Sequence, residues 1–201
     1  ANALGIQIIT FIDSSIAATK EKYFASKIIH LDIHLHGITA SLMTDKKDAS
    51  VEESIFIEEC GLLQLYDTWI KLITGSCIEQ LRYDPMHSAK TDQMLYNKVS
   101  TIIDEVTKKN KVTINIDSES VSKVIEINSS AFVDAVNTNY RHLVTKLRSL
   151  FSRNENYVIQ LTKQIAELPG LITLLESSFS CFVRVLDDLE PEKGACRFKT
   201  S

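Results

Sequence analysis

Three histidines near the N-terminus have the residue type and the spacing that metal binding requires. His30, His34 and His36 all fall within residues 30–36. On a helix His30 and His34 would share one face, because residues four apart are neighbours there, and two neighbouring imidazoles can bind one zinc ion. No nearby glutamate or cysteine completes a tetrahedral set. We therefore predict no metal site and no cofactor, and keep these three histidines as the candidates if a metal does bind.

The same stretch can also be interpreted as a strand, in which the histidines alternate with apolar residues. The string Asp32-Ile33-His34-Leu35-His36-Gly37 resembles the first metal-binding strand of amidohydrolase-type metalloenzymes. The resemblance covers these six residues. It implies a metal-dependent hydrolase in which His34 and His36 project from a strand end onto one metal ion. The fold implied is a barrel of alternating strands and helices, with a further pair of histidines and a late aspartate. Elsewhere the chain offers only His87 and His142.

Other catalytic patterns are missing from the sequence. There is no Gly-x-Ser-x-Gly elbow for a nucleophile, and the six glycines form neither a P-loop nor a GxGxxG motif. The neighbouring carboxylates Glu58 and Glu59 would point about a third of a turn apart on a helix, which is typical of a solvated edge rather than of an acid/base pair. The sequence therefore favours a protein that is not an enzyme.

Basic side chains concentrate in one later segment. Arg141 and Arg148 are seven residues apart, as are Lys146 and Arg153, so each pair can share a helical face. A charge run of this kind is usually a solvated face, or it meets acidic residues of neighbouring helices. The functional alternative is a docking strip for an acidic partner, a phosphoinositide headgroup or RNA. The predicted partner-binding residues are Arg141, Lys146, Arg148, Arg153 and Asn154.

Composition limits the class of protein. The chain has 201 residues, of which 44% are hydrophobic and 24% charged, and its net charge is −4. These are ordinary globular values, and the charge gives no global attraction to nucleic acid or to anionic lipid. The four cysteines show no zinc-type spacing, which favours reduced thiols in an intracellular, cytoplasmic protein. The apolar run 4–16 is too short to span a bilayer, so no transmembrane segment is predicted.

The elements that would position these residues are predicted to be helices, because only six glycines and three prolines interrupt the chain. The strongest signal is a ladder of large side chains with alternating spacings of three and four, which predicts one long helix over 130–168. Its members are Val136, Tyr140, Leu143, Leu147, Leu150, Asn154, Tyr157, Leu161 and Leu168.

Further helices are predicted over 4–28, 28–43, 50–81, 91–108 and 171–189. For 28–43 the helix is preferred to the strand because the helical period continues past Gly37. The segment 111–128 carries a β signal, and a short hairpin, an extended crossing segment and a brief helix all remain open for it.

We therefore predict an all-α fold, an elongated and mainly antiparallel bundle of five or six helices with an irregular or extended segment near 111–128. The bundle would form a single domain over 1–190, followed by a flexible tail over 191–201. The predicted function is a non-enzymatic protein–protein interaction module, a scaffold, adaptor or assembly subunit that binds its partner through helical surfaces and is able to self-associate. The alternatives are a membrane- or lipid-contacting helical protein and, with less support, the metal-dependent hydrolase.

Overall fold

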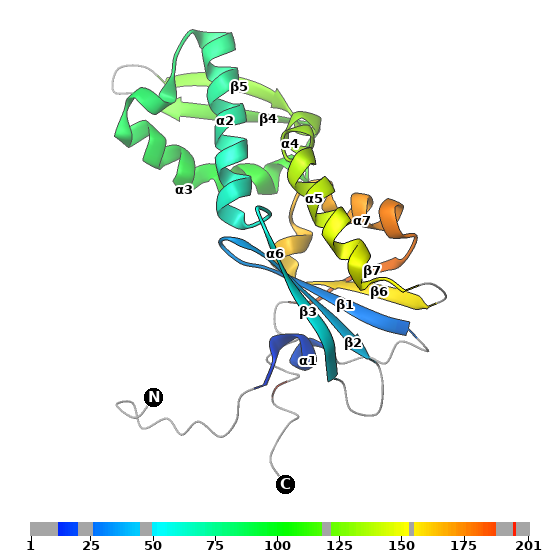
Figure 1. Cartoon of the computed structure of the whole chain (residues 1–201). Coiled ribbons are helices and arrows are strands. Elements are labelled where there is room, and N and C mark those ends of the chain that lie inside the picture. The colour runs from blue at the N-terminus through cyan, green and yellow to red at the C-terminus, as the bar shows by residue number, and fades with distance from the viewer. Residues whose placement is uncertain are drawn as a thin grey trace, which may run out of the picture.

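A five-stranded mixed sheet forms one layer of the molecule in the computed structural model, which describes residues 12–19, 26–44, 50–117, 122–152, 155–187 and 195 (Figure 1). The strand order is β3-β2-β1-β6-β7. The first three strands form an antiparallel meander, whereas β1 and β6, and then β6 and β7, pair in parallel. The strands are β1 (Ser26–Ile33), β2 (Gly37–Thr44), β3 (Ser50–Glu58), β6 (Asn156–Leu161) and β7 (Phe182–Val185).

Helices cover both faces of this sheet. The front face carries α5 (Asn137–Leu147), the short α6 (Lys163–Ala166) and α7 (Leu171–Phe179), while the short α1 (Ser14–Ala18) lies on the back face (Figure 1). The Gln160 side-chain amide donates to the carbonyl oxygen of Ala18 at 3.1 Å, which ties α1 to the centre of the sheet. The central strands are therefore buried on both faces.

A second lobe stands on the front side of the sheet and is built from the chain between β3 and β6 (Figure 1). A two-stranded hairpin packs there against two long helices, α2 and α3. Trp69 of α2 is fully buried, and its indole N–H donates to the carbonyl oxygen of Phe132 at 2.9 Å. The elements are α2 (Leu62–Leu81), the 3₁₀ turn η2 (Pro85–His87), α3 (Ala89–Val106), β4 (Lys111–Asp117), β5 (Ser122–Asn128) and α4 (Ser129–Ala135).

The prediction of an all-α helical bundle is wrong, because a substantial sheet replaces several predicted helices. The predicted helix 28–43 is the β1–β2 hairpin, and the first part of the predicted helix 50–81 is β3. Central strands that are covered on both faces read as nearly continuous apolar runs rather than as a clean alternation. Such a run satisfies the helical period as well as the strand period, so spacing alone could not separate the two.

The coiled-coil-like ladder is a helix only in its first half. Val136, Tyr140, Leu143 and Leu147 lie on or beside α5, face the core and are buried, and the 3₁₀ turn η3 (Arg148–Leu150) ends this part. The later members Tyr157 and Leu161 belong to β6 instead. Within the described residues there is no long helix over 130–168 and no coiled coil. The spacing of the ladder continues into β6 by coincidence, and the β-branched residues of that segment favour a strand.

The predicted elements after residue 90 agree with the structure in part. The helix predicted over 91–108 is confirmed as α3, and the hairpin alternative for 111–128 is confirmed as β4–β5. The last helix is shorter than predicted, because Ser180 adopts a left-handed conformation (φ 49°) that ends α7 and leads into β7. The tail 191–201 lies outside the described residues except for Ala195.

Candidate functional site

The three candidate histidines lie on and just after β1, so the strand interpretation of this stretch is the one the structure adopts. His30 points to the back face of the sheet and is only 3% exposed, while His34 and His36 lie in the exposed turn that follows the strand. The prediction of a helix over 28–43 is therefore wrong for this stretch, and the alternation of histidines with apolar residues is that of a strand. His30 and His34 therefore do not share a helical face, and the zinc pair proposed on that ground does not form.

His30 is a buried neutral side chain. Neither of its ring nitrogens has a hydrogen-bond partner, although its neighbour in the sheet, Gln160, is also polar. Burial lowers the pKa of His30, and the carboxylates of Asp32 and Asp13 oppose that shift only in part. The cost of desolvating an imidazolium therefore holds this ring in its uncharged form.

His34 is fixed by its neighbours rather than left free. Its Nε2 lies 2.9 Å from the hydroxyl oxygen of Thr39, and its ring lies 6.4 Å from the ring of Phe56. Across the described part of the chain, no three histidine, cysteine, aspartate or glutamate side chains come close enough together to hold a metal ion. The barrel implied by the amidohydrolase resemblance is also not the fold observed, which is an open sheet.

The turn between β1 and β2 is anchored to the start of α2. The backbone N–H groups of Leu62 and Leu63 donate to the carbonyl oxygens of His34 and Leu35, both at 3.0 Å. These carbonyls satisfy two of the N–H groups that a helix start leaves without an intrahelical partner. Gly61 makes the contact possible, because a Cβ there would lie 2.3 Å from the backbone nitrogen of Gly37. The turn is therefore held rigidly against the helix.

Three large apolar side chains surround this turn and are exposed. Leu35 in the turn is 58% exposed, Phe56 on β3 is 53% exposed and Leu63 on α2 is 38% exposed. All three residues lie beside the turn, because the Phe56 ring lies against Gly37 while the Leu63 backbone N–H bonds to the carbonyl oxygen of Leu35. We call these three residues the turn patch. The sequence does not reveal this patch, because Leu35 and Phe56 fall in the segments 28–43 and 50–81, which are predicted to be helical.

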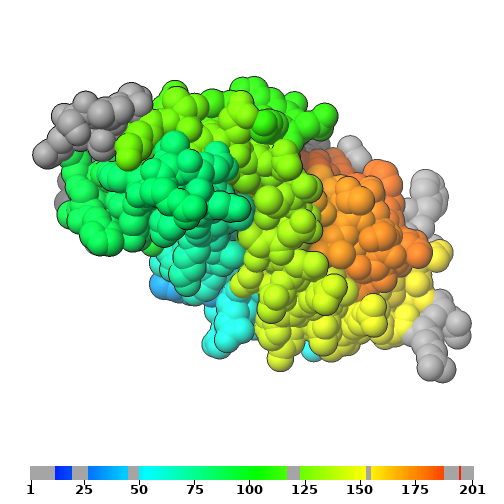
Figure 2. Space-filling model, turned by 90° about the horizontal axis from the view of Figure 1, so that it is seen from above, coloured from blue at the N-terminus to red at the C-terminus, as the bar shows by residue number. Residues whose placement is uncertain are grey.

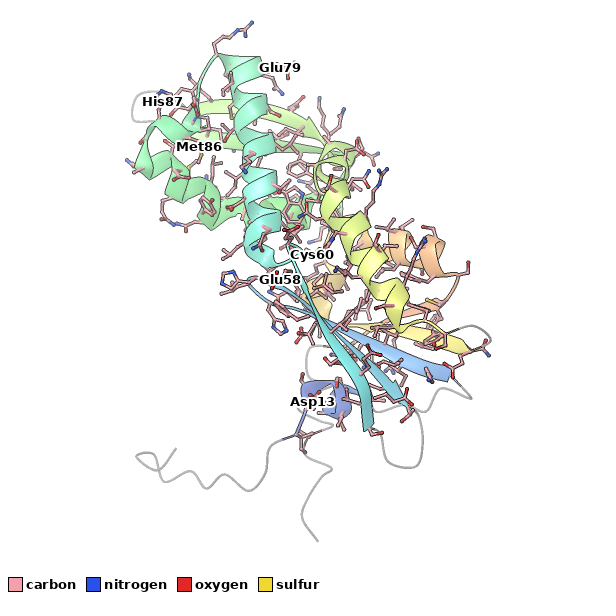
Figure 3. The ribbon with its side chains drawn as sticks, in the orientation of Figure 1. Asp13, Glu58, Cys60, Glu79, Met86 and His87 are labelled. Atoms are coloured by element: carbon pink, nitrogen blue, oxygen red, sulfur yellow. The ribbon has the colours of Figure 1, made fainter. Side chains whose placement is uncertain are left out.

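The start of α5 is tied to the end of β3 beside this turn. The Asn139 side-chain amide donates to the carbonyl oxygen of Glu59 at 2.6 Å, and the Cys60 thiol donates to the carbonyl oxygen of Asn139 at 3.1 Å. Burial raises the pKa of the Cys60 thiol to about 11, so it is an unreactive structural thiol. Figure 3 shows Glu58 and Cys60 near the base of α2, whereas Asp13 lies beside α1 towards the other end of β3.

The predicted basic residues lie along the outer side of α5 and the turn after it. Arg141, Lys146 and Arg148 are all exposed, and none of them forms an ion pair with the residues that the structure describes. We call these three residues the basic strip. Figure 2 shows α5 running across the molecular surface between α2 and α7. Arg153 and Asn154, the other two predicted partner-binding residues, lie outside the described residues.

No protein-family model matches the chain, and no curated protein is significantly similar to it. Among the described residues, no helix has the length and apolar character needed to cross a membrane. Any assignment of function must therefore begin from the surfaces described above.

Proposed function

We propose that this chain is a non-enzymatic protein–protein interaction module that binds an acidic partner through the outer surface of α5. The observation that supports this proposal is the basic strip, three exposed cationic side chains on α5 and the turn after it that form no ion pair within the described chain. Basic side chains that are already exposed attract an acidic partner over distances of about 10 Å at ordinary salt concentrations.

The buried side of α5 fixes the position of the helix that carries the basic strip. Tyr140, Leu143 and Leu147 hold the helix against the sheet and are almost completely buried. The Tyr140 hydroxyl also donates to the carbonyl oxygen of Pro169 at 3.1 Å, which fixes α5 relative to α7. A rigid helix presents its charges without a large loss of conformational entropy when a partner binds.

The proposal can be tested with a fluorescein-labelled oligoglutamate peptide, whose binding is measured by fluorescence anisotropy. We expect saturable binding that weakens as salt is raised and that falls at least tenfold in the triple variant R141E/K146E/R148E. The matched control is K71E/K90E/K108E, which makes the same change in net charge at three other exposed lysines. Equal loss of binding in the two variants, or no binding by the unchanged protein, would contradict the proposal.

The lipid-contacting alternative is separated by a second probe. Vesicles containing phosphatidylserine present negative charge without a polypeptide, so flotation with and without this lipid measures contact with the membrane. Flotation that depends on the basic strip, together with no binding of the peptide, would favour the lipid alternative over a protein partner.

A further inference from the structure

The turn patch is a second surface, with a chemistry opposite to that of the basic strip. Large apolar side chains that gather on a surface commonly mark a site of interaction, whereas single exposed ones do not. Leu35, Phe56 and Leu63 are exposed beside one turn, and the hydrogen bonds from the start of α2 hold that turn in place. Their exposure is therefore built into a rigid part of the fold.

The charged side chains nearest to the turn patch along the chain are negative. Between residues 50 and 70 the chain carries five carboxylates and no lysine or arginine. Glu58 and Glu59 immediately follow Phe56 and Ile57 on the chain, are exposed, and form no ion pair within the described residues. Glu52, in contrast, is paired with Lys27 at 3.1 Å, at the far end of β3. The five carboxylates are Glu52, Glu53, Glu58, Glu59 and Asp67.

We propose that the turn patch docks a segment of a partner protein that combines apolar side chains with lysine or arginine. The apolar side chains would cover Leu35, Phe56 and Leu63, and the cations would face Glu58 and Glu59. Interfaces commonly have this arrangement of an apolar centre and a charged rim. The charge at the rim selects a basic segment, because an acidic one would place like charges together.

The experiment uses two labelled synthetic peptides, one of lysine and leucine and the other with glutamate in place of every lysine. Every measurement is made in the R141Q/K146Q/R148Q background, in which the basic strip is neutral and does not bind the glutamate peptide. We expect saturable binding of the lysine–leucine peptide and at least tenfold weaker binding of the glutamate–leucine peptide. The variant L35S/F56S should weaken binding of the first peptide at least tenfold, and E58Q/E59Q should weaken it several-fold. All four side chains are exposed, so circular dichroism and thermal unfolding should show that both variants remain folded.

The matched control is I78S/V124S, which removes two other exposed apolar side chains, on α2 and β5. It should leave binding unchanged. The proposal is overturned if this control weakens binding as much as L35S/F56S, if both peptides bind equally, or if neither binds. It is also overturned if sedimentation velocity shows self-association that L35S/F56S abolishes, because the occupant would then be a second copy of the chain. Because the peptides are measured in the R141Q/K146Q/R148Q background, none of these results depends on the basic strip.

Discussion

At the scale of single residues, His30 shows how a polar side chain is adapted to a strand that is covered on both faces. In β1 it alternates with core residues but faces α1 instead of solvent, so it is buried without a hydrogen bond. Burying a polar group that lacks a partner costs free energy, and burying it as a cation would cost more. The neutral ring is therefore a condition for the stability of the fold.

This condition makes stability depend on pH. The pKa of His30 is lower in the folded chain than the value of about 6.5 in an unfolded chain, so the unfolded chain binds the proton more readily. The contribution to the free energy of unfolding is complete above pH 6.5 and is lost as the pH falls towards the folded pKa. Each tenfold difference in proton affinity between the two states contributes about 1.4 kcal/mol.

We therefore expect urea denaturation to show a falling free energy of unfolding between pH 7.5 and pH 5.5, and His30→Leu to reduce that fall. The control is His36→Gln, which removes an exposed histidine and should keep the pH dependence of the unchanged protein. An identical slope with pH in the His30→Leu variant would show that other groups are responsible.

At the scale of elements, the sequence was informative for α3, β4 and β5, each of which has one buried face and one exposed face. The apolar residues of α3 follow the helical period, and those of β4 and β5 alternate, so these elements were recognised as a helix and as a β signal. The periodicity failed for β1 and β6, which are buried on both faces. It also could not show that Gly37 and Gly61 bring the β1–β2 turn against α2, because that contact joins separate elements.

The contact between the turn and α2 can be tested with two glycines. Gly61→Ala would place a Cβ 2.3–2.5 Å from the backbone of residues 35–37, so we expect it to destabilise the fold by about 1–3 kcal/mol. Gly75 lies inside α2, where an added Cβ would meet nothing within 4 Å, so Gly75→Ala should stabilise the fold by about 0.5–1 kcal/mol. Thermal unfolding measures both, and destabilisation by both substitutions would contradict this account.

At the scale of the whole molecule, the two lobes share one core. Buried side chains run without a break from Ile29 and Leu31 of the sheet to Trp69 of α2 and Ile114 of the hairpin. The first residues of α2 contact the β1–β2 turn, and the helix extends from there into the second lobe (Figure 1). This helix therefore connects the sheet to the second lobe. A continuous core of this kind favours cooperative unfolding.

We therefore expect one unfolding transition for the whole molecule. The single tryptophan, Trp69, is buried in the second lobe, so its fluorescence reports on that lobe, whereas far-ultraviolet circular dichroism reports on all elements. The two signals should change at the same urea concentration. Separate midpoints would show instead that the lobes unfold independently.

Two hydrogen bonds join the start of α5 to the end of β3. The Asn139 side-chain amide donates to the carbonyl oxygen of Glu59, and the Cys60 thiol donates to the carbonyl oxygen of Asn139. They bring the exit point of the second lobe next to its entry point, so the segment 61–138 leaves the sheet and returns at one place. Without that segment, β3, α5 and β6 would still form an ordinary strand–helix–strand crossover. We expect chains related to this one to differ first in the length and content of this insertion while their five strands keep the same order.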